Sequence, residues 1–178
     1  LEALPDDFTV IHSVRWITHN TREHGTVGEA DFVVAHPAHG VLILEVKGGE
    51  IRVERNQWIS RDRLGTDHPI KDPFAQADRS RYALLEWLKN DHRTRPFTYP
   101  VFPAVAFPDV GVAGDLRPDS PRDIIIDLVR LDALEQTLVD VFAFWRGKYP
   151  HLAMGGRPAV EALVALLVPT RQLQSRIA

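Results

Sequence analysis

Two acidic side chains and a lysine lie at the ends of two apolar runs in this sequence. Asp31 precedes the run Phe-Val-Val-Ala, and Glu45-Val46-Lys47 ends the run Val-Leu-Ile-Leu. Successive side chains of a strand point to opposite faces of a sheet, so Glu45 and Lys47 share one face. With Asp31 on a neighbouring strand, two carboxylates and an ammonium group meet at one point of the sheet. This combination favours binding of a divalent metal ion and hydrolysis of a phosphodiester.

We expect Asp31 and Glu45 to be metal ligands and the main-chain carbonyl of Val46 to be a third. Mg²⁺ prefers carboxylates and keeps several waters, so two acids and a carbonyl suffice as protein ligands; Mn²⁺ is the alternative ion. Hydrolysis of a phosphodiester also needs a cation that offsets the developing negative charge. Lys47 is expected to supply that charge or to orient the attacking water.

A structural ion-pair network is the alternative interpretation of these three residues. Charged groups on an otherwise apolar central strand are costly to bury unless they have partners or a function, which favours the active site. For a histidine pair across a turn, a surface position in the turn is favoured over metal binding. For an aromatic residue that could stack on a base, packing is favoured, and for arginines that could contact phosphates, a place on the solvated surface. These residues are His36, His39, Trp58, Arg52, Arg55, Arg61, Arg63, Arg79 and Arg81.

The hydrophobic pattern predicts one α/β domain with a mixed sheet flanked by helices. Residues 41–47 are so continuously apolar that they are expected to form a central strand, buried on both faces. Asp72 and Pro73 are expected to begin a helix as N-cap and first residue. The polar segment 62–71 is predicted to be a loop, and residues 1–5 the end of a helix. Strands are predicted at residues 8–14, 29–35, 41–47, 50–54, 57–61, 101–107 and 123–127, and helices at 73–92, 131–149 and 158–168.

Composition excludes several classes of protein. The 178 residues include no cysteine, so disulfides, a thiolate nucleophile and cysteine-ligated zinc are excluded. No apolar run has the roughly 20 residues of a membrane span, and we expect a cytoplasmic protein without a membrane partner. The net charge of −3 argues against a strongly basic nucleic-acid binder, yet residues 47–95 carry eleven Lys/Arg against eight Asp/Glu. A modest basic face beside an acidic site is compatible with a phosphate backbone.

The residues Asp31…Glu45-Val46-Lys47 resemble the PD-(D/E)xK nuclease signature. The extended pattern looks like the NERD (nuclease-related) domain over roughly residues 1–150, and this pattern is far more specific than the signature alone. Its matching positions are 28–34, 36–37, 40–42, 45–49, 58, 72–74, 76–77 and 105–108. The resemblance implies a restriction-endonuclease-like core and Mg²⁺-dependent cleavage of DNA. It also implies that Gln76, on the helix after the sheet, is a catalytic residue that helps to bind water at the metal or the phosphate.

The family context implies partners beyond DNA. NERD domains often precede a superfamily 1 helicase or a kinase-like domain, so residues 151–178 are expected to be a helical segment and linker toward a helicase-like domain. Nucleases of this fold often pair, which makes a homodimer possible. Related nucleases often carry a glutamate on a first helix, and Glu2 lies too late to occupy that position. Two alternatives to an enzyme therefore stay open. One is a catalytically silent nucleic-acid-binding module of a helicase, and the other is an interaction domain that uses the stripe Val160, Leu163, Val164 and Leu167.

Overall fold

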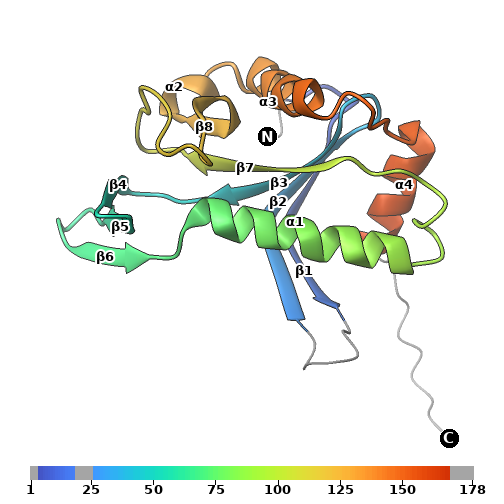
Figure 1. Cartoon of the computed structure of the whole chain (residues 1–178), viewed down its shortest axis with the longest axis horizontal. Helices are drawn as coiled ribbons and strands as arrows, with labels where there is room; N and C mark the ends of the chain where they lie inside the picture. Colours follow the sequence, from blue (N-terminus) through green and yellow to red (C-terminus); the bar gives the residue numbers. More distant parts are fainter. Residues whose placement is uncertain (1–3, 19–25, 169–178) are drawn as a thin grey trace, which may run out of the picture.

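A five-stranded sheet forms the centre of the molecule, and a separate three-stranded sheet projects from one end of it (Figure 1). The computed structural model describes residues 4–18 and 26–168. Its strands are β1 Thr9–Thr18, β2 Thr26–His36, β3 Gly40–Val46, β4 Glu50–Glu54, β5 Gln57–Arg61, β6 Asp67–Ile70, β7 Val101–Phe107 and β8 Ile125–Asp127. Its helices are α1 Pro73–Asn90, the 3-10 turn η1 Arg122–Ile124, α2 Leu128–Leu131, α3 Leu134–Lys148 and α4 Gly156–Leu167.

The large sheet has the order β1-β2-β3-β7-β8, so β3 lies in the middle as predicted. β1, β2 and β3 pair antiparallel, whereas β7 and β8 continue the sheet parallel to β3. β3 is buried from Gly40 to Glu45, because it has strands on both edges and helices over both faces. The predicted α/β class is therefore confirmed, as a mixed central sheet flanked by helices in a restriction-endonuclease-like core.

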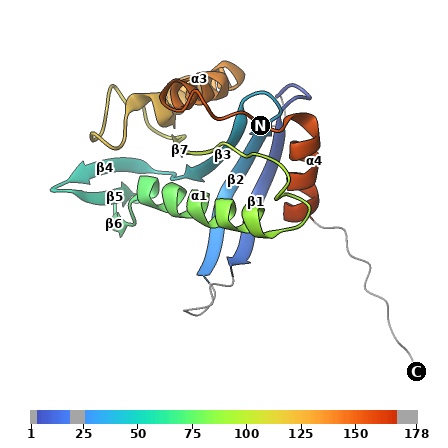
Figure 2. The ribbon, with the colours of Figure 1, turned by 45° about the vertical axis from the view of Figure 1, so that its right-hand side comes forward.

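Helices α1 and α4 cover one face of the large sheet, and α3 covers the other (Figures 1 and 2). Alternation along β3 divides its side chains between these faces. Val41 and Ile43 pack with Leu84 of α1 and Leu163 of α4. The side chains between them face α3, and this second core contains Leu42, Leu44, Phe102, Leu138, Val141 and Phe142.

Helix α1 begins where the sequence predicts. The Asp72 carboxylate accepts hydrogen bonds from the N–H groups of Phe74 and Ala75, and Pro73 occupies the first turn. The helix ends at Asn90, with the N–H of Asp91 donating to the Trp87 carbonyl. Its start is thus fixed directly after the small sheet.

The predicted loop over residues 62–71 is wrong in part, because Asp67–Ile70 forms β6 and pairs with β5. Strand β6 is polar and contains Pro69, which is tolerated at an edge position. Its pairing is supported by Asp67, whose carboxylate accepts hydrogen bonds from Arg52 and Arg61 at 3.1 Å and 2.8 Å. These ion pairs join residues of different strands, and Ile70 packs against the core, so no periodicity within the segment reveals the strand.

Other predicted boundaries need smaller corrections. The predicted helix over residues 131–149 corresponds to α3, which begins three residues later, at Leu134, and is preceded by the short helix α2. Leu4 and Pro5 are not helical, and the rest of the predicted N-terminal helix, residues 1–3, lies outside the described residues. Residues 169–178 of the predicted linker also lie outside them. No helix of the described residues is long and apolar enough to cross a membrane.

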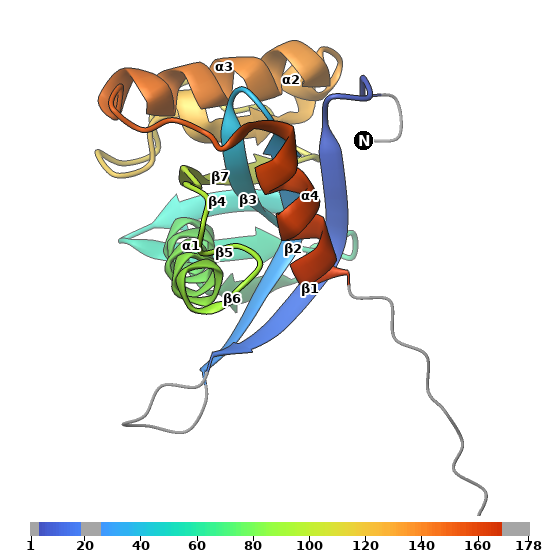
Figure 3. The same ribbon diagram turned by 90° about the vertical axis from the view of Figure 1, so that its right-hand side faces the viewer.

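Helix α4 belongs to the same core as the sheet (Figure 3). Val160 and Leu163 are buried against β1 and β2, and the Tyr99 hydroxyl donates to the Ala159 carbonyl at 2.8 Å. The apolar stripe that motivated an interaction domain is therefore largely occupied within the chain. Whether residues 151–178 lead into a further domain stays a prediction.

Leu163→Ala is expected to destabilise the domain by about 2–5 kcal/mol, the usual cost of truncating a fully buried leucine. The measurement is urea unfolding monitored by circular dichroism. Leu128→Ala is the matched control, since Leu128 is 52% exposed and should change stability by less than about 0.5 kcal/mol. Equal effects of the two substitutions would contradict the placement of α4 in the core.

Candidate active site

Strand pairing brings Asp31 beside Glu45. The β2–β3 register pairs Phe32 with Leu44, so the next positions along the two strands are Asp31 and Glu45. Beyond that pair, the N–H of Val46 donates to Asp31 Oδ2 at 2.7 Å. The Asp31 side chain thus takes the place of the main-chain carbonyl that would accept this bond in a regular ladder. The carboxylate is thereby held at the end of the ladder between the two strands.

Strand β1 has a kink opposite Asp31, at the same point of the sheet. β1 pairs His12 with Phe32 and Val14 with Ala30 and skips Ser13 and Asp31, and Ser13 has a φ of 53°. A positive φ is uncommon for a residue other than glycine. The local break in pairing leaves Asp31 free of β1 and able to reach β3. Nothing in the alternating pattern of the sequence indicates this kink.

Glu45 and Lys47 face the same side, as alternation predicts. Lys47 Nζ donates to Glu45 Oε1 at 2.6 Å, with side chains that are 24% and 7% exposed respectively. The N–H of Lys47 donates to the Ala106 carbonyl at 2.9 Å, which continues the parallel pairing to β7. Residues of a strand bond alternately to its two neighbours, so Val46 directs both its N–H and its carbonyl toward β2. The main-chain carbonyl expected as a ligand thus faces the strand that carries Asp31.

Among these residues, Glu45 is the acid whose charged form is disfavoured by its surroundings. Burial raises the pKa of Glu45, and the neighbouring carboxylates of Asp31 and Glu29 raise it further. The hydrogen bond and the charge of Lys47 act in the opposite direction and lower that pKa. A buried acid next to like charges gains most from a cation in its vicinity.

Gln76 lies in the first turns of α1, over the face of the sheet that carries Glu45 and Lys47. Its Oε1 is buried and has no hydrogen-bond partner among the described residues. A buried acceptor without a partner costs about 1–3 kcal/mol. One turn later the Ser80 hydroxyl donates to the Glu29 carbonyl at 2.5 Å, which fastens α1 to β2 close to Asp31. The structure thus brings Gln76 to this side of the sheet without a direct bond to either acid.

Two residues near the acids were missed by the sequence reasoning. Arg15 of β1 donates to Glu29 Oε1 at 3.0 Å, and Ser80 anchors the helix to the same residue of β2. Neither has a sequence signal of its own, because each acts through a contact between distant segments. Glu29 itself is exposed at the rim, where Arg15 balances its charge.

The donor set fits a hard divalent cation such as Mg²⁺ or Mn²⁺. Asp31 and Glu45 offer carboxylate oxygens from adjacent strands, and strand alternation directs the Val46 carbonyl toward β2, the strand that carries Asp31. Among the described residues there is no group of three or more His, Cys, Asp or Glu side chains placed to hold a metal ion. An ion here would therefore keep several waters, which Mg²⁺ does readily.

The histidine pair and Trp58 pack against other aromatic side chains. The rings of His36 and His39 lie 4.3 Å apart and pack against Phe8 and Phe142, and burial lowers the pKa of both histidines. Trp58 is buried in the core, as expected for a packing residue.

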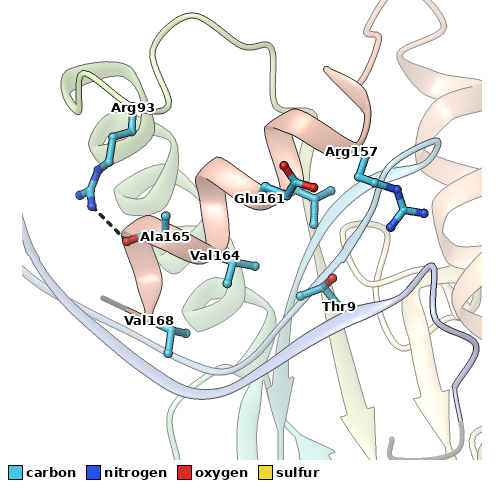
Figure 4. Close-up of a pocket in the computed structure, with 8 residues that line it drawn as sticks. Thr9, Arg93, Arg157, Glu161, Val164, Ala165 and Val168 are labelled. Carbon is cyan, nitrogen blue, oxygen red and sulfur yellow. Dashed lines mark hydrogen bonds between the residues drawn. The ribbon is translucent and has the colours of Figure 1, made fainter. Parts of the chain in front are cut away.

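A hollow of about 610 Å³ between α4 and β1 lies away from the acids (Figure 4). There Arg93 donates to the Ala165 carbonyl at 3.0 Å, and Arg157 pairs with Asp7 at the same distance. The cations of this hollow are thus already paired within the chain.

Comparison with known proteins gives one match. Residues 1–108 match the family model for the nuclease-related domain, NERD. No curated protein and no solved structure matches the chain.

Proposed function

The chain belongs to the nuclease-related domain family, and from this premise we propose that it is a metal-dependent nuclease domain that hydrolyses phosphodiester bonds of DNA. The observation that carries the proposal is the grouping of Asp31, Glu45 and Lys47 on neighbouring strands. Two carboxylates and a lysine at one point of a sheet supply the ligands and the positive charge that this reaction needs.

Asp31, Glu45 and the Val46 carbonyl would hold Mg²⁺ or Mn²⁺. When bound, the ion supplies a Lewis acid that polarises the phosphate and lowers the pKa of a water molecule. The Val46 N–H fixes one oxygen of Asp31, so the carboxylate cannot turn away from the site. Glu45 is buried, and the low dielectric constant of a protein interior strengthens charge interactions at this point.

Lys47 stabilises the charge that develops on the phosphate. Its ammonium group already lies 2.6 Å from Glu45 and stays partly exposed, so it can turn toward a substrate without a large movement. Gln76 is proposed to orient water or the phosphate through its amide. The buried oxygen without a partner supports this role, since rotation of the amide exchanges oxygen and nitrogen.

A catalytically silent nucleic-acid-binding module is the second candidate. It is favoured by the internal partners of both acids, since Val46 satisfies one Asp31 oxygen and Lys47 satisfies one Glu45 oxygen. In that case the three residues are a structural network and bind no ion. Attachment to a superfamily 1 helicase, a homodimer and a cytoplasmic location stay predictions from the sequence.

Cleavage of labelled single-stranded and duplex DNA tests the proposal. Purified domain is incubated with Mg²⁺, with Mn²⁺ and with EDTA, and products are resolved on a denaturing gel. We expect cleavage with either ion and none in EDTA. Cleavage that continues in EDTA, or none with either ion, would contradict the proposed activity.

A further inference from the structure

We propose that Ser13 is a positioning residue for Asp31. The left-handed backbone of Ser13 turns β1 and β2 away from β3, and the opening between β2 and β3 gives the Asp31 carboxylate its place beside Glu45. The inference rests on the proposed function for what Asp31 does, but it concerns the conformation of the chain. It can therefore be tested without DNA and without cleavage.

The large sheet divides at the two acids. Among the described residues, pairing between β2 and β3 ends at Phe32 and Leu44, whereas β2 stays paired with β1, and β3 with β7, beyond these residues. From this point β1 and β2 diverge from β3 together, as a two-stranded ribbon (Figures 1 and 2). We call this division between β2 and β3 the fork. Asp31 and Glu45 are the next residues beyond the last pair.

Ser13 lies at the base of the fork, opposite Asp31, and its φ is 53°. This left-handed conformation costs free energy in a residue other than glycine. The other two such residues among those described, Arg55 and Asn56, form the turn between β4 and β5, where a two-residue hairpin requires positive φ. Ser13 lies within a strand, so no turn accounts for its conformation.

The kink in β1 carries β2 with it. The two strands pair on both sides of Ser13, from Thr9 to His12 and again from Val14 to Thr18. A change of direction in β1 is therefore transmitted to β2. The Ser13 hydroxyl lies 3.0 Å from Nε2 of its neighbour His12, on the exposed surface. The backbone of Ser13, rather than its side chain, thus links this residue to the site.

Side chains satisfy main-chain groups that border the fork. Asp31 Oδ2 accepts the hydrogen bond of the Val46 N–H at 2.7 Å, and Ser80 of α1 donates to the Glu29 carbonyl of β2 at 2.5 Å. If the fork closed, β2 would offer Val46 a main-chain acceptor, and Asp31 would lose the bond that orients it. The orientation of Asp31 therefore depends on the fork, and the fork depends on the backbone of Ser13.

Two substitutions separate the backbone of Ser13 from its hydroxyl. Ser13→Gly removes the hydroxyl but adopts positive φ freely, whereas Ser13→Thr keeps the hydroxyl but disfavours positive φ because its β-carbon is branched. The first measurement is hydrogen exchange of the Val46 N–H, followed by NMR in metal-free protein. Ser13→Gly should keep the wild-type protection of this N–H, and Ser13→Thr should lower it by about tenfold.

The second measurement is affinity for Mn²⁺ by isothermal titration calorimetry. Ser13→Thr should weaken binding by about 10–100-fold, the usual effect of losing a contact that orients a metal ligand. Ser13→Gly should stay within about twofold of wild type, because glycine adopts this conformation without strain. His12→Thr is the matched control. It places the same side chain one position earlier, at an exposed residue that pairs regularly with Phe32, and should leave both measurements unchanged.

A loss of protection or affinity in Ser13→Gly would assign the effect to the hydroxyl and overturn the inference. Wild-type values in Ser13→Thr would overturn it as well. Circular dichroism checks folding, and if Ser13→Thr does not fold, Ser13→Ala replaces it, since alanine also disfavours positive φ. If the Val46 N–H responds as expected but the wild type binds no Mn²⁺, the positioning of Asp31 stands and the proposed metal-dependent activity fails.

Discussion

Asp31→Asn is expected to lower the rate of metal-dependent DNA cleavage by at least about 10²-fold, the usual loss for a group that stabilises charge in a transition state. The amide removes the negative charge that would hold Mg²⁺ or Mn²⁺ but keeps an oxygen for the Val46 N–H. The fold should therefore survive, and the loss should be in activity. The measurement is kcat/KM for the cleavage reaction, with circular dichroism as the check on folding.

Asp115→Asn is the matched control for this prediction. The Asp115 carboxylate accepts a hydrogen bond from the Arg122 N–H at 2.7 Å, the same kind of bond at the same distance, on an exposed loop. It should leave kcat/KM within about twofold, because it removes an exposed charge that has no role in the proposed reaction. If Asp31→Asn cleaves as fast as this control, Asp31 is not part of the active site.

Lys47→Ala is the second large effect, with an expected loss of about 10²–10³-fold in kcat. It should also move the acid limb of the pH–rate profile to higher pH. Burial already raises the pKa of Glu45, so this carboxylate loses its charge, and its affinity for a metal ion, at a higher pH than a solvated glutamate. Lys47 lowers that pKa by hydrogen bond and by charge, and its removal lets the pKa rise further.

The measurement is kcat and kcat/KM from about pH 5 to pH 9, with saturating Mg²⁺. Lys89→Ala removes an exposed lysine elsewhere and should reproduce the wild-type profile. An unchanged acid limb with reduced kcat would show that Lys47 acts on the phosphate but leaves Glu45 unaffected. Full activity would exclude Lys47 from the site.

The raised pKa of Glu45 also bears on stability without metal. The folded chain holds this proton more tightly than the unfolded chain, so the contribution of Glu45 to stability is greatest below its unfolded pKa. That contribution is lost as pH rises from the unfolded pKa through the raised folded pKa. Above the raised pKa, the buried and charged carboxylate of Glu45 lowers the stability of the fold. Such a cost is typical of groups that are retained for function.

The features that the sequence predicted well are those set by local rules. Alternation along β3 predicted that Glu45 and Lys47 share a face, and their ion pair confirms it. The N-cap chemistry of Asp72 predicted the start of α1. The continuous apolar run before Glu45 predicted a central strand, since only a strand buried on both faces tolerates it.

The features that the sequence did not predict depend on contacts between distant segments. Strand β6 pairs with β5, and its Asp67 bonds to arginines of two other strands, although the four residues of β6 show no strand pattern of their own. The kink at Ser13 and the Ser80 anchor become visible only when β1, β2 and α1 lie together. The proximity of Asp31 to Val46 likewise needed the register of β2 on β3, which spacing along the chain does not fix.

The most direct test of the active-site assignment is a crystal of the domain soaked in Mn²⁺, with the ion located by its anomalous scattering. We predict one bound ion between Asp31 and Glu45, about 2 Å from an oxygen of each and within reach of the Val46 carbonyl. The same soak of Asp31→Asn should show no ion at that place. An empty position between the two carboxylates of the wild type at saturating Mn²⁺ would contradict the assignment and favour a structural ion-pair network.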